Sequence, residues 1–377
     1  MESSAAESYS RGYNAPSNPT TEQEPRLRIL VTGHHGYLGS VTAPLLASAG
    51  HDVVGLDSDL FEGCTLGPRP PEGAWRSLRR DLREIELADL DGIDAVIHFA
   101  ALSNDPLGDL DPELTYEINL RGSIRLAEMA RDAGVRRFLF SSSCSNYGAS
   151  GDRLLDESAE LQPLTAYAIS KVRFEEELGR MASDRFSPVL LRNATAYGVS
   201  PRLRVDLVLN NLVAWGVTTG QIVLQSDGTP WRPIVHAEDI ARAFLRLLDA
   251  PRESVHAKAF NIVPEGENYQ IRDLAEIVAE AVPGCAVTFA EGAGPDPRNY
   301  RVSGTRLLDA FPDFSYRWNA RRGAHELVAA YRAAGLDRQT FEGPRFKRLA
   351  WIRRLLAEGL LSEDLRWTGA ARPVATA

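Results

Sequence analysis

Short apolar runs alternate along this chain with longer stretches in which apolar residues recur at helical spacing. Short runs bounded by turn residues are typical of strands buried in a parallel sheet, whereas apolar residues every three to four positions indicate a helix. Strands are predicted at residues 27–32, 52–56, 95–98, 137–141 and 189–191, and helices at 40–49, 111–133, 163–182 and 237–250. Because strands alternating with helices form parallel crossover units, the pattern predicts an α/β fold with a doubly wound parallel sheet.

A glycine-rich turn joins the first predicted strand to the first predicted helix. Gly33, Gly36 and Gly39 follow the strand with two residues between neighbours. This spacing permits a tight turn, lets the backbone approach a diphosphate and lets helix and strand pack closely, while the helix N-terminus points at the phosphates. The order of strand, turn and helix predicts a Rossmann dinucleotide-binding domain, with Tyr37 and Leu38 inside the binding turn.

An acidic residue, Asp57, ends the second strand, about 20 residues beyond the turn. A carboxylate at this point accepts hydrogen bonds from an adenosine ribose and repels a 2′-phosphate, so the sequence predicts NAD rather than NADP as the cofactor. His34 and His35, inside the turn, could instead meet an extra phosphate, but Asp57 followed by Ser58 outweighs them.

Tyr167 and Lys171 lie four residues apart in a predicted helix, so that both side chains share one face. An isolated tyrosine titrates near pH ~10, and a cation beside it favours the phenolate, which can take a proton from a hydroxyl group. The pair alone also fits an ordinary helix surface. The catalytic interpretation of the pair is supported by other candidate groups that lie at the carboxyl ends of strands, where such sheets bind ligands. These groups are Gly33–Gly39, Asp57, Phe99-Ala100-Ala101 and Ser141-Ser142-Ser143.

Composition narrows the class of protein. The 377 residues, 44% of them hydrophobic, suffice for one large or two unequal domains, and the net charge of −9 disfavours a nucleic-acid partner. The three cysteines lie far apart without the paired spacing of a zinc site, so we expect no metal and a reducing, cytoplasmic location. Since no run approaches the ~20 apolar residues of a membrane span, we expect no membrane partner either.

The chain divides into four predicted segments. Residues 1–25 are rich in Ser, Glu, Asn and Pro and are expected to be a disordered leader. Residues 26–188 should form the NAD-binding Rossmann domain, to whose sheet parts of 189–263 return. Residues 189–335 should form a smaller α/β substrate domain, and 336–377 a C-terminal helical extension.

The extension contains a basic amphipathic helix at residues 344–356, whose apolar face carries Trp351, Ile352 and Leu355. Helices of this kind can dock on membranes or partner proteins. Packing against the substrate domain or across a dimer explains the apolar face more simply.

These motifs together resemble the extended short-chain dehydrogenase/reductase family, specifically its NAD-dependent nucleotide-sugar epimerases and dehydratases of the UDP-galactose 4-epimerase type. The resemblance covers residues 26–332. The matching pieces are Thr32-Gly33-x-x-Gly36-x-x-Gly39, Asp57, Asp81-Leu82, His98-Phe99-Ala100-Ala101, Asn119, Ser141-Ser142-Ser143 before Tyr147-Gly148, Tyr167-x-x-x-Lys171, and Asp227-Gly228-x-x-x-Arg232-x-x-Val235-His236.

The resemblance implies a catalytic set of Ser143, Tyr167 and Lys171. Tyr167 would remove the proton of a sugar hydroxyl while hydride leaves that carbon for the nicotinamide; Lys171 would hold the nicotinamide ribose and lower the pKa of Tyr167; Ser143 would stabilise the oxyanion. In an epimerase the resulting ketone takes the same hydride on its other face, so NAD stays bound.

The resemblance also implies contacts to both ligands. Those to NAD are Gly33, Gly36, Tyr37, Leu38, Gly39, Asp57, Asp81, Leu82, Phe99, Ala100, Ala101, Asn119, Ser141, Tyr167 and Lys171. Those to a nucleotide-diphosphate sugar are Ser103, Ser143, Tyr167, Thr195, Asn211, Arg232 and Arg298. An arginine fork pairs well with a diphosphate. Both arginines could equally be surface salt-bridge partners, and Asn211 could serve as a helix cap.

Departures from the family pattern leave the reaction open. Dehydratases of the family place an Asp-Glu pair after the serine, where this chain has Cys144 and Ser145, so dehydration is disfavoured. Ser103 stands where a lysine is common and Pro233 where an aspartate often follows the arginine. We therefore expect a nucleotide-sugar epimerase acting at C4, with a 4,6-dehydratase or 4-ketoreductase as alternatives. A non-catalytic NAD-binding sensor is the alternative of another class.

Several further features have structural explanations. Cys144 invites a nucleophile hypothesis, but a buried thiol at a strand end is the better interpretation because no base lies at a recognisable spacing. His98 is expected to be a satisfied core histidine, and His236 to cap or pair near the following helix. The family resemblance suggests a homodimer formed through the helices at 111–133 and 163–182.

Overall fold

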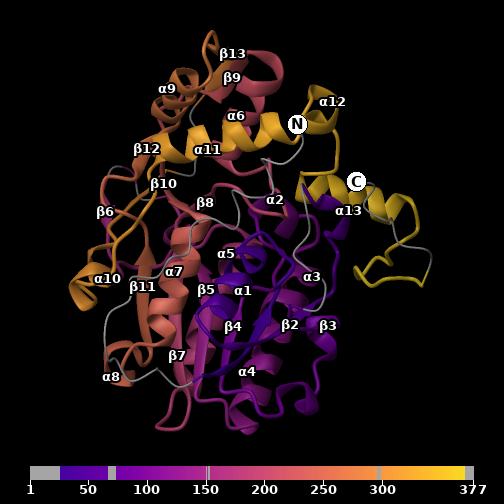
Figure 1. Cartoon of the computed structure of the whole chain (residues 1–377), viewed down its shortest axis with the longest axis vertical. Coiled ribbons are helices and arrows are strands. Elements are labelled where there is room, and N and C mark those ends of the chain that lie inside the picture. Colours follow the sequence, from indigo (N-terminus) through magenta and orange to yellow (C-terminus); the bar gives the residue numbers. More distant parts are fainter. Residues whose placement is uncertain (1–25, 67–73, 150, 152, 295–298, 370–377) are drawn as a thin grey trace, which may run out of the picture.

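The computed structural model describes residues 26–66, 74–149, 151, 153–294 and 299–369. Its centre is a seven-stranded parallel sheet with the strand order β11-β7-β5-β4-β1-β2-β3 (Figure 1). The strands are β1 (Arg28–Thr32), β2 (Asp52–Asp57), β3 (Arg76–Arg79), β4 (Ala95–His98), β5 (Arg137–Ser143), β7 (Ser187–Asn193) and β11 (Lys258–Ile262). Because the chain crosses to opposite sides of β1, the sheet has a switch point between β1 and β4, which confirms the predicted doubly wound α/β fold.

Helices cover both faces of the sheet because both faces of its strands are apolar. In β1, Ile29 and Val31 belong to the apolar cluster that contains residues of α1 and α7, whereas Leu30 belongs to the cluster that contains residues of α4 and α5. These four helices are α1 (Gly39–Ser48), α7 (Ala237–Leu248), α4 (Gly122–Asp132) and α5 (Ala166–Met181). The alternation places one helical layer on each side of the sheet.

The helix predicted at residues 111–133 is interrupted. Asp111 caps α3 (Pro112–Tyr116) by accepting a hydrogen bond from the Leu114 amide at 3.0 Å. A π-helical turn, η4 (Glu117–Arg121), then leads into α4. Turns of this kind widen a helix locally and often occur near functional sites.

A second layer of structure lies beyond one end of the sheet (Figure 1). It contains two small sheets, the first made of β8 (Thr195–Tyr197), β10 (Trp231–His236) and β12 (Asn268–Gln270), the second of β9 (Gln221–Ser226) and β13 (Ala286–Gly294). Its main helices are α6 (Val208–Thr219), α9 (Ile271–Ala281) and α11 (Ala320–Ala333). Their apolar side chains form one cluster that also includes Leu60, Leu102 and Leu107 from the first layer, so the two layers share a core.

Short elements complete the chain. They are η1 (Glu62–Cys64), η2 (Leu82–Glu84), η3 (Leu87–Leu90), α2 (Asp105–Gly108), η5 (Cys144–Tyr147), β6 (Leu154–Leu155), α8 (Arg252–Val255), β14 (Arg301–Val302), α10 (Thr305–Ala310), α12 (Arg338–Glu342) and α13 (Arg348–Ala357). None of the helices in the described ranges has the length and apolar character that a membrane-spanning segment needs. The domain limits at residues 188 and 335 stay a prediction, and the leader at 1–25 lies outside the described residues.

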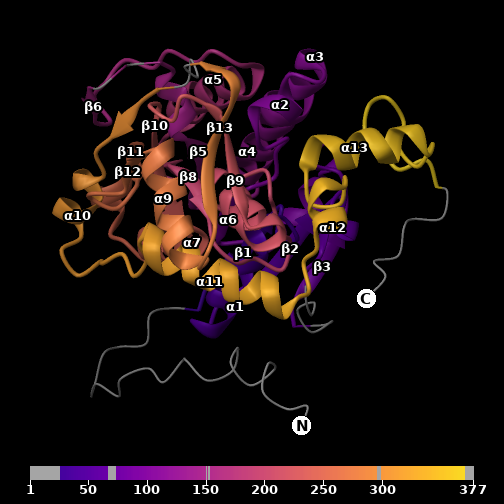
Figure 2. The ribbon, with the colours of Figure 1, turned by 90° about the horizontal axis from the view of Figure 1, so that it is seen from above.

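The C-terminal extension packs in part where the sequence predicts, since its apolar residues belong to the core cluster of the second layer. In Figure 2, α12 and α13 lie on the side of β2 and β3, and α12 also packs against α6, where the ring centres of Phe341 and Trp215 are 4.9 Å apart. The apolar face predicted from the sequence is correct, since Trp351, Ile352 and Leu355 are buried. Part of what it covers, however, is the loop after β2, where Leu60 and Cys64 join the same cluster.

Candidate active site

A cavity of about 890 Å³ opens at the carboxyl ends of the central strands. This volume lies near the upper end of the ~300–1,000 Å³ that is usual for small-molecule sites. The predicted site residues that line it are Gly33, Gly36, Tyr37, Leu38, Gly39, Asp57, Asp81, Leu82, Phe99, Ala100, Ala101, Ser103, Ser141, Ser143, Tyr167, Lys171, Thr195, Asn211 and Arg232. Residues spread over about half of the chain therefore share one space.

The glycine turn has the shape that a diphosphate needs. Gly33 has a φ of +73°, and a Cβ atom there would lie 2.8 Å from the Ala100 amide nitrogen. A Cβ on Gly39 would lie 2.1 Å from the carbonyl oxygen of Gly33. Protein backbone occupies the places where these side chains would go, so glycine is required for the tight turn and for the close packing of turn, helix and neighbouring strand that a dinucleotide-binding turn has.

Asp57 lies at the end of β2 beside this turn. Its carboxylate accepts hydrogen bonds from the amides of His35 at 3.0 Å and Asp59 at 2.8 Å. Burial and the nearby charge of Asp59 raise the pKa of Asp57. A carboxylate held in this way suits the hydroxyl donors of a ribose and opposes a phosphate in their place, which is the donor and acceptor pattern that NAD requires.

His34 and His35 do not offer a phosphate site. The ring of His34 is fully buried and pairs with Ser77 Oγ at 2.8 Å, and burial lowers its pKa to about 4, so it is neutral at physiological pH. His35 pairs through Nδ1 with Asp59 Oδ1 at 2.6 Å. Both rings are therefore engaged by the protein itself.

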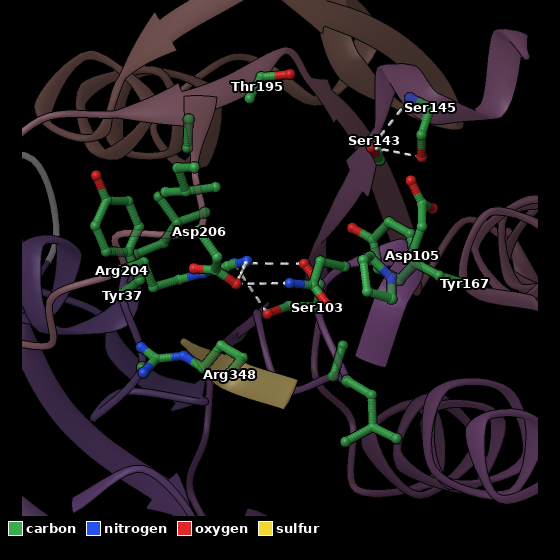
Figure 3. Close-up of a pocket in the computed structure, with 18 of the residues that line it drawn as sticks. Tyr37, Ser103, Asp105, Ser143, Ser145, Tyr167, Thr195, Arg204, Asp206 and Arg348 are labelled. Carbon is green, nitrogen blue, oxygen red and sulfur yellow. Dashed lines mark hydrogen bonds and ion pairs between the residues drawn. The ribbon is translucent and has the colours of Figure 1, made fainter. Parts of the chain in front are cut away.

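The predicted catalytic residues come together from two elements. Tyr167 and Lys171 lie on α5, and Ser143 ends β5 (Figure 3 shows Ser143 and Tyr167). Lys171 Nζ donates a hydrogen bond to the Ser141 carbonyl oxygen at 2.9 Å and lies 5.6 Å from the centre of the Tyr167 ring. Ser143 Oγ accepts hydrogen bonds from the Ser145 amide at 3.1 Å and from its hydroxyl at 2.9 Å.

In the protein alone the pKa of Tyr167 is raised rather than lowered. Burial, followed by the charge of Asp105, raises the pKa of Tyr167 to about 12, while its side-chain contact with Ser143 acts in the opposite direction. Burial also lowers the pKa of Lys171 to about 7, against the attraction of Glu175. Burial thus outweighs any lowering by Lys171 in the protein alone, because the site that removes water from the phenol removes it from the ammonium as well, and the effect expected of Lys171 stays a prediction.

Asn119 has a different place from the one implied. It does not line the cavity; its side chain accepts from the Leu102 amide at 2.8 Å and donates to the Leu102 carbonyl at 3.0 Å. It therefore positions the loop after β4, which carries Ala100 and Ala101, from the π-helical turn η4. Its effect on a cofactor would be indirect.

The predicted substrate residues line the opposite wall. Asn211 donates to the Val205 carbonyl at 2.9 Å while facing the cavity, and Arg232 is 8% exposed and hydrogen-bonds to the Trp231 carbonyl at 2.8 Å. Arg232 is thus buried at the cavity rather than exposed on the surface. Arg298 lies outside the described residues.

The sequence did not single out a buried ion pair in the middle of the cavity. Arg204 makes a two-pronged contact with Asp206, at 3.0 Å for each arm, and donates to Ser103 Oγ at 3.2 Å (Figure 3). Asp105, on α2, also lines the cavity and accepts from Thr165 Oγ1 at 2.7 Å. Nothing in the pattern marks these charges as buried, because charged residues in a loop are usually exposed.

The structural interpretations of three other residues are confirmed. Cys144 is fully buried, its thiol donates to the Arg192 carbonyl at 3.1 Å, and burial raises its pKa, so it is unsuited to act as a nucleophile. His98 is satisfied by Thr32 Oγ1 at 2.6 Å and Ser123 Oγ at 2.8 Å. His236 caps α7 by accepting from the Glu238 amide at 3.1 Å.

Comparisons with known proteins agree with this geometry. The chain is 28% identical to the UDP-glucose 4-epimerase of Bacillus subtilis over 327 residues, which cover 80% of this chain and 95% of that protein. The solved structure of the Thermus thermophilus UDP-glucose 4-epimerase with NAD is 25% identical with a TM-score of 0.68, and covers 82% of this chain and 100% of that one. The structure of MoeE5 with UDP-glucose and NAD is 26% identical with a TM-score of 0.69, and covers 81% and 99%.

The family model described as the NAD dependent epimerase/dehydratase family matches residues 29–263. This range contains the glycine turn, Asp57, Ser143, Tyr167 and Lys171. The chain therefore belongs to the NAD-dependent epimerase/dehydratase family of nucleotide-sugar enzymes.

Proposed function

We propose that this protein is a nucleotide-sugar 4-epimerase that oxidises its substrate transiently and returns the hydride to the opposite face. The observation that carries the proposal is that Ser143, Tyr167 and Lys171 line the same cavity as the glycine turn and Asp57. A hydroxyl group of a bound sugar can then meet the proton acceptor and the hydride acceptor at once.

Each catalytic side chain has a defined task in this proposal. Tyr167 Oη takes the proton from the C4 hydroxyl, and Ser143 Oγ, kept in place by Ser145, holds the substrate oxygen on which charge develops. NAD bound in the cavity supplies the hydride acceptor and, in its oxidised form, a positively charged ring. Lys171, fixed by the Ser141 carbonyl, holds the nicotinamide ribose, and proton removal becomes easier as positive charge gathers near the buried phenol.

The residues after Ser143 favour epimerisation. Cys144 is buried and points to the Arg192 carbonyl, and Ser145 has a hydroxyl bound to Ser143. Neither can exchange protons with a sugar as an acidic pair can near neutral pH. A keto sugar formed here would lack the acid and base that loss of water requires from this position.

One observation favours a 4,6-dehydratase as the second candidate. Asp105 brings a carboxylate into the cavity from α2, close enough to Tyr167 for its charge to raise the tyrosine pKa (Figure 3). A carboxylate there is a possible acid or base for loss of water from a keto sugar. The choice between the two reactions depends on whether Asp105 reaches the sugar.

Incubation with UDP-, dTDP-, GDP- and CDP-sugars tests the proposal. A 4-epimerase gives a product of unchanged mass and inverted C4 configuration without net formation of NADH. A product lighter by one water identifies a dehydratase, and an Asp105→Asn variant that abolishes only that product assigns the role of the carboxylate. Absence of conversion of every sugar would contradict both candidates.

We also propose a homodimer that works in the cytoplasm. The helices α4 and α5 lie side by side on one face of the sheet. Half-buried apolar residues occur on both, Ile124 on α4 and Ile169 and Val172 on α5, and Leu120 on the preceding turn η4 is also half-buried. A second copy packing on them would form a four-helix contact. The three cysteines are free thiols, which suits a reducing compartment. Light scattering of the purified protein distinguishes a dimer from a monomer.

A further inference from the structure

The C-terminal extension brings one buried cation into the cavity. Arg348, the first residue of α13, lines the cavity and is 2% exposed (Figure 3). Its Nη2 donates to the Arg202 carbonyl at 3.1 Å, and its guanidinium carbon lies 4.3 Å from the centre of the Phe61 ring. Its Nη1 has no hydrogen-bond partner among the described residues.

A buried cation with an unpartnered N–H group is unfavourable unless a ligand supplies a hydrogen-bond acceptor for that group. Burial lowers the pKa of Arg348 to about 10, so the side chain still carries its charge at neutral pH. The neighbouring charges do not remove this cost: Arg204 and Arg202 lower the same pKa, and Asp206, which raises it, is already paired with Arg204. The chemistry missing from this corner of the cavity is therefore that of an anion.

The surroundings of Arg348 belong to the cofactor side of the cavity. Arg202, to which it is hydrogen-bonded, donates its Nε to the His35 carbonyl of the glycine turn at 2.7 Å and its Nη1 to the Phe61 carbonyl at 2.9 Å. Phe61 follows Asp57 in the loop after β2. Arg348 is thus linked through Arg202 to the turn that receives a diphosphate, and its contact with the Phe61 ring places it beside the loop after β2.

The start of α13 adds to the positive charge. Lys347, the residue before Arg348, lines the cavity and makes no side-chain cap hydrogen bond to the helix. An uncapped helix N-terminus carries partial positive charge on its free amides. This feature alone would specify no ligand, but it lies at the same place as the unpartnered Nη1.

The extension is fastened to the loops that flank the adenosine end of the cofactor site. Trp351 Nε1 donates to the Leu60 carbonyl at 2.9 Å, and Trp367 Nε1 donates to the Ser58 carbonyl at 2.7 Å. Beyond β3, Arg83 Nη2 donates to the Asp364 carbonyl at 2.9 Å. The contacts join residues after β2 and after β3 to a segment that lies beyond the family match at 29–263.

We propose that Arg348 binds a diphosphate oxygen of NAD through Nη1, and that the extension at residues 338–368 thereby retains the cofactor between turnovers. The site fits the group, since the glycine turn has the geometry of a dinucleotide-binding turn and Arg348 lines the same cavity. Cofactor binding by the family is the only premise. The inference therefore stands or falls independently of the sugar and of the reaction at C4.

The test compares Arg348→Met with Arg353→Met, a matched control on an exposed arginine of the same helix. Calorimetry on the full chain freed of cofactor gives the affinities for NAD, ADP-ribose and adenosine. We expect Arg348→Met to bind NAD and ADP-ribose about 10- to 100-fold more weakly, as for loss of a charge-assisted hydrogen bond, and adenosine unchanged. Arg353→Met should match the parent for all three, and Arg348→Lys should be intermediate.

Two further measurements separate a ligand contact from a structural role. The melting temperature of the cofactor-free Arg348→Met protein should equal or exceed that of the parent, because a buried unpaired charge is removed. The NAD carried through purification should fall below that of the Arg353→Met control. The proposal is overturned if the melting temperature falls sharply, if NAD affinity is unchanged, or if only the affinity for UDP falls, which would assign Arg348 to the substrate diphosphate.

Discussion

Two kinds of buried cation occur in this protein, and they differ in the partners that the protein gives them. Arg192 is fully paired: it donates Nη2 to Glu175 at 2.7 Å and Nη1 to the Tyr147 hydroxyl at 3.1 Å, and these partners raise its pKa. Lys171 and Arg348 face the cavity instead, and burial lowers the pKa of both. The protein thus supplies the partners of Arg192 itself, whereas Lys171 and Arg348 depend on a bound ligand for theirs.

The comparison separates buried charges that stabilise the protein from buried charges that serve binding or catalysis. A buried ion pair with matched geometry can be disrupted only at a large loss, whereas a buried cation without a full set of partners destabilises the protein in the absence of ligand. Unsatisfied cations persist where binding or catalysis needs them. Substitutions that break the Arg192 ion pair and substitutions that remove a cavity cation should therefore have opposite effects on stability.

The largest effect is expected for Lys171→Met. Turnover should fall about 10²- to 10⁴-fold, because the nicotinamide ribose loses its anchor and the proton transfer loses a nearby charge. The melting temperature of the ligand-free protein at neutral pH should nevertheless stay equal or rise. Kinetics measures the loss of turnover, and calorimetry on the same preparation measures the melting temperature. A marked loss of stability would make Lys171 a structural residue like Arg192.

Glu175→Gln should act in the opposite direction. It leaves Arg192 as a buried charge without its counter-ion, so the free energy of unfolding should fall by about 3–5 kcal/mol. Urea denaturation measures this loss. The double variant Glu175→Gln/Arg192→Met should recover part of it, and failure to recover would show that Glu175 stabilises the protein through Ser142 or Asn146 instead.

The pH dependence of stability sharpens the comparison further. The folded protein releases the Lys171 proton near pH 7, whereas the unfolded chain keeps it up to about 10.5. Between these values the unfolded state binds more protons, so this lysine makes stability rise with pH, by up to about 1.4 kcal/mol per pH unit. The slope from pH 7 to 10 should be smaller in Lys171→Met, and equal slopes would contradict the low pKa.

The smallest effect is expected at a surface pair of the C-terminal extension. Arg366 and Glu84 form an ion pair with side chains 38% and 55% exposed. Because solvent screens such pairs, Glu84→Gln should change the free energy of unfolding by less than about 1 kcal/mol and leave NAD affinity as it was. A larger change in either quantity would mean that this pair, rather than Arg348, fastens the extension over the cofactor.

The sequence predicts the strands β1, β2, β4, β5 and β7 of the central sheet, but not β3 or β11, and it predicts the site residues at the ends of those strands. Both follow from local patterns: apolar runs give the strands, and the glycine turn, Asp57 and the Tyr167–Lys171 spacing fall at strand ends that topology brings together. The buried charges could not be predicted in this way. Arg204 and Arg348 are of a residue type that is usually exposed. Only the tertiary structure shows that both line the cavity.

The titration of the catalytic pair shows a second limit of sequence reasoning. Spacing on a helix places Tyr167 and Lys171 on one face, as observed. It does not report how deeply the pair is buried, and burial dominates the pKa of both groups. The charge that favours a phenolate must therefore come largely from what the cavity binds.

The most direct test of the account uses a nucleotide sugar deuterated at C4, with UDP-glucose as the first choice because relatives act on it. If the cavity holds the oxidised intermediate and returns the same hydride, the C4 epimer forms with its deuterium retained on C4 and no NADH accumulates in solution. Loss of the deuterium to solvent or its appearance in free NADH would contradict a closed hydride cycle in this cavity.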